Sequence, residues 1–104
     1  MYERYSWNTY HKLLAWAWLR SELIGKDTFT LKEASNSLDI TAGTLRRVSW
    51  TLKHSGYISG EKGKTQQTSW TYKLTESGDD YAAYCVTLMY KLGYEELIRN
   101  AVLS

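Results

Sequence analysis

Residues 41–74 decide the fold, and they read TAGTLRRVSWTLKHSGYISGEKGKTQQTSWTYKL. Apolar side chains recur at helical spacing behind Thr41, whose hydroxyl can cap a helix that runs from about 41 to 54. From 57 to 74 the sequence begins as a strand, passes through a polar, glycine-containing turn and ends in an alternating segment. That order is typical of a β-hairpin. We therefore predict a helix followed directly by a hairpin.

A shorter helix is expected just before this one. Thr30 and Glu33 have the spacing of a capping box, and the helix that they open ends near Leu38. A tight turn from 37 to 40 leads into the helix of 41–54. Two helices joined by a tight turn and followed by a hairpin form a winged helix-turn-helix.

Helices are also expected on both sides of this core. One runs from about 6 to 24 and carries apolar residues on two neighbouring faces, so we expect it to lie between partners. The other runs from about 76 to 103 and is interrupted at Gly93. The predicted fold class is mainly α with a small β-hairpin wing (α+β). At 104 residues, the chain is expected to form a single winged-helix domain, 1–104, with its core at 28–82.

The net charge of +2 conceals an uneven distribution. Residues 41–73 carry six Lys or Arg against one Glu, whereas residues 1–40 are neutral and residues 74–104 are net acidic. A basic middle third inside a nearly neutral chain indicates one face that is suited to an anionic partner.

Residues 28–82, TFTLKEASNSLDITAGTLRRVSWTLKHSGYISGEKGKTQQTSWTYKLTESGDDYA, resemble winged helix-turn-helix transcriptional regulators of the broad MarR, PadR and ArsR type. The resemblance rests on the two capped helices, the strand YIS, the basic turn and the closing phrase LTESGDDYA. In such regulators, a phrase like Leu-Thr-x-x-Gly joins the wing to the next helix. The resemblance implies double-stranded DNA as partner, with the helix of about 41–54 in the major groove and the wing of about 57–74 on the backbone or in the minor groove.

The sequence departs from that family in three places. Leu38 and Asp39 occupy a turn that often holds glycine, and the wing tip carries lysines where MarR-type proteins have an arginine cluster. The chain is also short for a full MarR regulator. These departures favour a compact relative, such as a small viral, plasmid or archaeal regulator.

The outward side of the helix of 41–54 carries the expected DNA contacts. Arg46 and Arg47 point away from the apolar side of the helix, and arginine can pair bidentately with guanine in the major groove. Thr41 and Thr44 are placed to reach phosphates at the start of the helix. The predicted DNA-binding residues are Thr41, Gly43, Thr44, Arg46, Arg47, Trp50, Lys53, His54, Lys62 and Lys64.

Several of these residues have a second interpretation. Gly43 either permits a close backbone approach to DNA or has no consequence, since glycine costs little in a first helical turn. Lys62 and Lys64 either contact phosphates or are ordinary solvated turn residues. Trp50 either contacts thymine methyl groups or sugars, or packs under the wing against Trp70 or Tyr72.

Aromatic residues crowd the two ends of the chain, which holds five Trp and nine Tyr. Aromatic side chains concentrated on terminal helices indicate a subunit interface. We therefore expect a homodimer formed by the first and last helices. The predicted interface residues are Tyr10, Trp16, Trp18, Tyr84, Leu88, Leu92 and Ile98. An aromatic-lined ligand pocket at the same seam is the alternative, although nothing in the sequence indicates a small-molecule effector.

Enzymatic chemistry finds no support in the sequence. The two histidines, His11 and His54, are far apart, and no Cys and His residues cluster as metal ligands would, so we expect no metal and no cofactor. Cys85 lies on an apolar helical face and is expected to be a buried, inert thiol; the alternative is an oxidant sensor or an intersubunit disulfide. The absence of a leader and of a membrane-length apolar run predicts a cytoplasmic protein.

The sequence thus predicts a dimeric, sequence-specific DNA-binding protein, most simply a transcriptional repressor. Two other functions stay open at this point. One is a winged-helix module that binds proteins, because the fold alone does not fix function. The other is a replication or recombination accessory protein that binds DNA.

Overall fold

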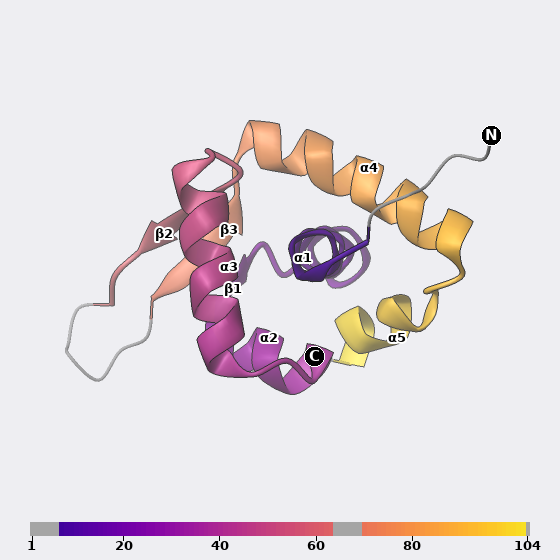
Figure 1. Cartoon of the computed structure of the whole chain (residues 1–104), viewed down its shortest axis with the longest axis horizontal. Helices are drawn as coiled ribbons and strands as arrows, with labels where there is room; N and C mark the ends of the chain where they lie inside the picture. The colour runs from indigo at the N-terminus through magenta and orange to yellow at the C-terminus, as the bar shows by residue number, and fades with distance from the viewer. Residues whose placement is uncertain (1–6, 64–69, 104) are drawn as a thin grey trace.

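The computed structural model describes residues 7–63 and 70–103, and in these ranges it confirms a mainly helical winged helix-turn-helix with a small antiparallel sheet (Figure 1). The elements, in chain order, are α1 (Thr9–Ile24), β1 (Thr28–Phe29), α2 (Leu31–Leu38), α3 (Ala42–His54), β2 (Ile58–Glu61), β3 (Thr71–Leu74), α4 (Glu76–Leu92) and α5 (Glu96–Leu103). None of the helices in these ranges is long and apolar enough to cross a membrane.

Side-chain caps set where the helices begin. Thr30 accepts the backbone N–H of Glu33, and the Glu33 carboxylate accepts the backbone N–H of Thr30, so the predicted capping box of α2 is present. Thr41 caps α3 and Thr75 caps α4 in the same way, each accepting a backbone N–H three residues later. Between α2 and α3, Asp39 adopts the left-handed conformation (φ 56°) that glycine often supplies in such turns.

Helix α1 forms the centre of the molecule. Figure 1 looks along its axis, with α3, α4 and α5 arranged around it. It contacts α4 and α5 most extensively, and half of its side chains are buried. We expected this helix to lie between partners, and the partners are other elements of the same chain.

This central position corrects two of the predicted dimer contacts. Trp16 is completely buried, and its indole nitrogen donates to Ser37 Oγ at 2.8 Å. Leu88 on α4 is also buried within the protomer. Neither side chain is available to a second copy, because each already fills space inside its own chain. The crowding of aromatic residues on the terminal helices, from which the interface was predicted, is met in part by the core of the chain itself.

The sheet has the strand order β1-β3-β2, with both pairs antiparallel. The predicted hairpin is therefore joined by a third strand from upstream of α2, in which Thr28 is paired with Lys73 and Phe29 with Tyr72. This pairing fixes the root of the wing to the start of the helix-turn-helix. The tip of the wing, residues 64–69, lies outside the described residues.

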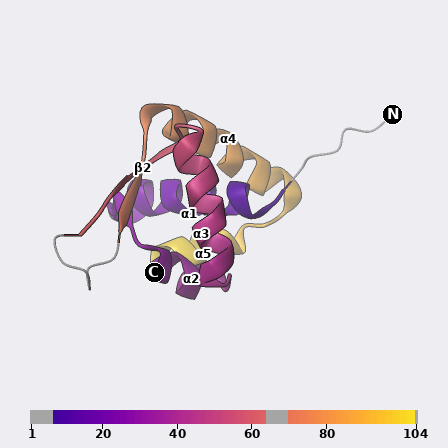
Figure 2. The ribbon, with the colours of Figure 1, turned by 60° about the vertical axis from the view of Figure 1, so that its left-hand side comes forward.

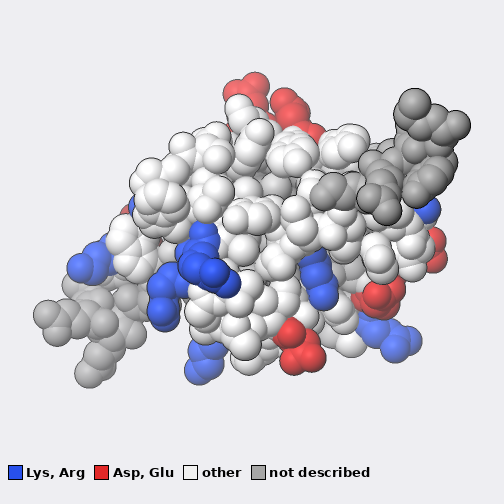
Figure 3. Space-filling model, viewed as in Figure 1, with Lys and Arg blue, Asp and Glu red and all other residues white. Residues whose placement is uncertain are grey.

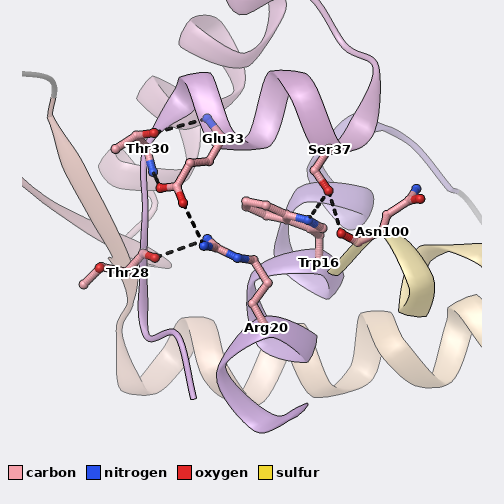
Figure 4. Close-up of polar contacts among 7 residues, drawn as sticks. All are labelled: Trp16, Arg20, Thr28, Thr30, Glu33, Ser37 and Asn100. Atoms are coloured by element: carbon pink, nitrogen blue, oxygen red, sulfur yellow. Dashed lines mark hydrogen bonds and ion pairs between the residues drawn. The ribbon is translucent and has the colours of Figure 1, made fainter. Parts of the chain in front are cut away.

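A buried arginine connects α1 to the helix-turn-helix (Figure 4). Arg20 donates to the carbonyl of Thr28 at 3.2 Å and to Glu33 Oε2 at 2.9 Å, while its guanidinium lies 4.6 Å from the centre of the Trp16 ring. Ser37, which accepts from Trp16, donates in turn to the carbonyl of Asn100 on α5 at 2.8 Å. One chain of contacts thus joins α1, β1, α2 and α5.

Gly78 explains the Leu-Thr-x-x-Gly phrase after the wing. The carbonyl of Tyr57 accepts the backbone N–H of Thr75 at 3.0 Å, which brings the first turn of α4 onto the start of the wing. A Cβ atom at position 78 would overlap that carbonyl oxygen. Glycine is therefore required at position 78 because two backbone segments meet there.

Replacement of Gly78 by Ala should destabilise the protein by about 2–3 kcal/mol, because the new methyl group must displace backbone atoms rather than a flexible side chain. For a domain of this size, the melting temperature should fall by about 10–20 °C. Gly43→Ala on α3 is the matched control, since a Cβ there meets open space and alanine favours a helix. Thermal unfolding followed by circular dichroism would contradict this account if both variants melted alike.

His11 occupies the glutamate position of a second capping box, at the start of α1. Its Nδ1 accepts the backbone N–H of Asn8 at 3.2 Å, so the proton of the neutral ring lies on Nε2, which donates to the Tyr81 hydroxyl at 3.3 Å. The ring is also stacked on Trp7. Burial lowers the pKa of His11 below its ordinary value of 6.5, and a proton on Nδ1 would oppose the N–H of Asn8.

The free energy of unfolding should therefore fall as the pH drops below about 6.5. In that range His11 takes up a proton in the unfolded chain but stays neutral in the folded one. This loss should end once the pH passes below the lowered pKa of the folded state. His11→Gln keeps an acceptor for the Asn8 N–H but does not titrate. The difference in unfolding free energy between the parent protein and this variant, measured by urea titration from pH 5 to 8, should grow in favour of the variant toward acid. A constant difference across that range would show that His11 does not contribute.

Candidate nucleic-acid interface

The exposed side of α3 forms the candidate interface. Its inner side carries four buried residues, Leu45, Val48, Ser49 and Leu52. The sequence predicted the three apolar ones but not Ser49. Its outer side faces solvent beside the β2–β3 wing (Figures 1 and 2). This exposed side carries Gly43, Arg46, Arg47, Trp50, Lys53 and His54.

Positive charge gathers on this face. In Figure 3, Lys and Arg atoms cluster over α3 and the neighbouring wing, whereas Asp and Glu atoms lie mainly toward α4 and α5. Within residues 7–63 and 70–103, no carboxylate oxygen lies within 4.0 Å of the Arg46 or Arg47 guanidinium. Both arginines therefore present donors that an anion can occupy.

The first turn of α3 offers further hydrogen-bond donors. Thr41 donates its hydroxyl proton to Thr44 Oγ1 at 2.9 Å, so the hydroxyl proton of Thr44 stays available to another acceptor. Thr41 and Gly43 are exposed, and Thr44 is half-buried. A helix start with exposed hydroxyls and backbone N–H groups is suited to a phosphate.

Trp50 stands exposed in the middle of this face, with 63% of its surface accessible. Its ring is stacked on His54 at 3.9 Å between centroids, and His54 Nδ1 donates to the Trp50 carbonyl at 2.8 Å. Of the two interpretations that the sequence left open, the structure therefore excludes packing under the wing. Trp70 and Tyr72 stack on each other instead, 6.4 Å apart.

Lys53 connects α3 to the wing. Its ammonium lies 4.3 Å from the centre of the Trp70 ring, a cation–π contact. Arg46 also lies near the wing. Burial raises the pKa of Tyr72, and the positive charge of Arg46 partly opposes that rise. The sequence named Lys53 and Arg46 as DNA contacts but did not show these contacts with the wing. The alternation of Trp70, Tyr72 and Leu74 was the signal that placed the two aromatic rings on one side.

An open groove of about 650 Å³ runs between α3 and the start of α1. Sequence reasoning missed it, because it is formed by segments more than 30 residues apart. Tyr10, which we predicted to be a dimer contact, lies in this groove beside α3. The lining residues are Asn8, Thr9, Tyr10, Thr44, Arg46, Arg47, Val48, Trp50 and Thr51.

The remaining predicted residues are distributed over the wing and the two long helices. Lys62 is exposed directly after β2, and Lys64 lies outside the described residues. Among the predicted dimer contacts, Tyr84 on α4 is 51% exposed. Three others are partly covered by their own chain, namely Trp18, Leu92 and Ile98.

Cys85 is buried in the core between α1 and α4. Burial raises the pKa of its thiol to about 12, so the reactive thiolate is scarcely populated at neutral pH. This agrees with the interpretation as an inert core residue. Nowhere in the described ranges do three or more His, Cys, Asp or Glu side chains come together as a metal site would require.

Comparison with known proteins shows the fold. No protein-family model and no curated protein matches the sequence. The solved structure of the adhesin competence repressor AdcR from Streptococcus pyogenes is similar, with a TM-score of 0.63 and 15% sequence identity over 88% of this chain and 66% of that one. The disulfide form of AbfR has a TM-score of 0.58 and 21% identity over 86% and 62%. A mutant of MarR from E. coli, solved in complex with operator DNA, has a TM-score of 0.56 and 22% identity over 89% and 69%.

These neighbours are winged-helix regulators of the MarR type, so the fold that the sequence resemblance predicted is confirmed. The chain spans slightly less than two thirds of the length of the first two structures.

Proposed function

We propose that this protein is a dimeric, sequence-specific regulator that binds double-stranded DNA, most simply a repressor that covers a promoter. The observation that carries the proposal is the outer face of α3, which presents two guanidiniums without carboxylate partners in the described ranges. A similar fold in MarR from E. coli has been solved with operator DNA, which supports the same type of partner here.

In this proposal, α3 enters the major groove, which is wide enough for one helix. Arg46 and Arg47 contact base edges or phosphates, and Thr41 and Thr44 contact phosphates at the start of the helix. Lys62 and Lys64 reach the backbone or the minor groove from the wing. Gly43 allows close approach, since it leaves open space above the helix. In a dimer, two α3 helices would occupy successive major grooves about 10 base pairs apart.

Selection of bound sequences from a random duplex pool should recover a palindromic site with that half-site spacing. Replacing both Arg46 and Arg47 by Ala should abolish binding to the selected duplex, because the two strongest donors of the face are lost. The control replaces Lys26 and Arg99 by Ala, which removes the same charge at positions outside α3 and the wing and should leave binding largely intact. For the parent protein, roughly five phosphate contacts per subunit predict a log–log salt slope near −4.5 per subunit.

Three outcomes of that experiment would count against the proposal. A pool with no enriched sequence and no binding above background would favour a protein-interaction module. Tight binding without sequence preference would favour an accessory protein of replication or recombination. An affinity that is flat between about 50 and 200 mM salt would contradict the electrostatic basis of the interface.

The dimer is a separate prediction. Light scattering at about 100 µM should give the mass of two chains, since Tyr84 leaves a large aromatic surface exposed on α4. Tyr84→Glu should shift the equilibrium toward the monomer, because a charge is costly to bury in an interface. Arg46→Ala, on the face assigned to DNA, should leave the mass unchanged. A parent protein that is monomeric at this concentration would disprove the prediction.

A further inference from the structure

Trp50 occupies the centre of the α3 face, where an exposed indole is unexpected. Among the described residues, it is the most exposed aromatic side chain. Burial of such a ring is favourable, and within the described ranges its one aromatic ring contact is the stacked imidazole of His54. The unsatisfied apolar surface therefore points to a partner that covers it.

The indole ring has one defined aromatic neighbour. His54 lies one helical turn after Trp50, stacks on the indole with an interplanar angle of 26°, and donates to the Trp50 carbonyl. Because the same histidine contacts both the ring and the backbone of Trp50, the indole loses little further conformational freedom when it binds.

The position of Trp50 along the helix matches a row of base pairs. Arg46, Trp50 and His54 follow one another at intervals of four residues, so they form a ridge about 12 Å long. Base pairs stack about 3.4 Å apart, so the ridge covers three to four of them. The apolar group that the major groove offers is the C5 methyl of thymine.

A protein partner fits this surface less well. An apolar protein surface that covered Trp50 would also bury Arg46 and Arg47, which have no carboxylate within 4.0 Å in the described ranges. Burying unpaired guanidiniums is costly. A nucleic-acid duplex supplies phosphates to the arginines and methyl groups to the indole at the same time.

We propose that Trp50 determines sequence preference by contacting the C5 methyl group of thymine in the major groove, and that His54 is the positioning residue for its ring. This inference rests on the proposed function, since it names what one residue of the same face reads. It assigns Trp50 to methyl groups, whereas Arg46 and Arg47 supply hydrogen bonds.

The test replaces thymine by deoxyuridine, one position at a time, in the duplex recovered from the random pool. Deoxyuridine keeps the charge and base pairing of thymine and lacks only the methyl group. The parent protein should lose about three- to fivefold in affinity at one or two positions of each half-site, the size expected for one methyl group removed from apolar contact. Trp50→Ala should bind more weakly and no longer distinguish thymine from deoxyuridine at those positions.

Two further variants separate this role from a structural one. His54→Ala should reduce the discrimination between thymine and deoxyuridine without lowering the melting temperature appreciably, because His54 is exposed. His54→Phe should restore much of it, since a phenyl ring can stack on the indole. Tyr90→Ala is the matched control, because Tyr90 is also an exposed aromatic residue (53%) but lies on α4; it should discriminate as the parent does.

The inference fails if the parent protein binds its selected duplex but tolerates deoxyuridine at every position, or if Trp50→Ala keeps the full discrimination. In either case the proposed DNA-binding function stands. If no duplex is bound above background, the proposed function and this inference both fail.

Discussion

The ion pair between Arg20 and Glu33 is the interaction on which the arrangement of the molecule depends. Arg20 is almost fully buried, and a buried guanidinium is tolerated only when its charge is compensated. Glu33 supplies that compensation with one carboxylate oxygen while the other caps the first turn of α2. A single side chain thus fixes both the start of α2 and its position on α1. Since α3 follows α2 through a short turn, the orientation of the candidate DNA-binding face is set by the same pair.

The candidate interface combines charge with rigidity. Among its cations, Lys53 contacts the Trp70 ring of the wing, and Arg46 lies near enough to Tyr72 to influence its pKa. Its exposed indole is stacked on His54. Pre-ordered side chains lose less entropy on binding than free ones do. The face therefore combines the positive charge that attracts a polyanion with side chains that have defined neighbours, which is what the proposed sequence-specific binding requires.

The sequence predicted the elements that local chemistry decides. The capping residues Thr30 and Thr41 and the alternation before Leu74 are short-range signals, and the structure confirms the helices and the hairpin that they indicated. It did not predict what depends on distant segments: the pairing of β1 with β3, the groove beside Tyr10, and the place of Trp16. Crowded aromatic residues indicate that rings are covered but not by what, and Trp16, which we predicted to be a dimer contact, lies in the core of its own chain. The predicted contacts with DNA stay predictions, since binding is a property of a complex.

The central place of β3 in the sheet has a mechanical consequence. Because β3 is hydrogen-bonded to β2 on one side and to β1 on the other, the two described strands of the wing cannot shift without pulling on the segment that leads into α2. At the other end of the hairpin, the contact of Gly78 with Tyr57 fastens the residue before β2 to the first turn of α4. The root of the wing is therefore joined to the segment before α2 and to the start of α4. In the proposed dimer on DNA, a binding site of unusual spacing would have to be accommodated by bending of the DNA or by the way in which the two subunits are set against each other.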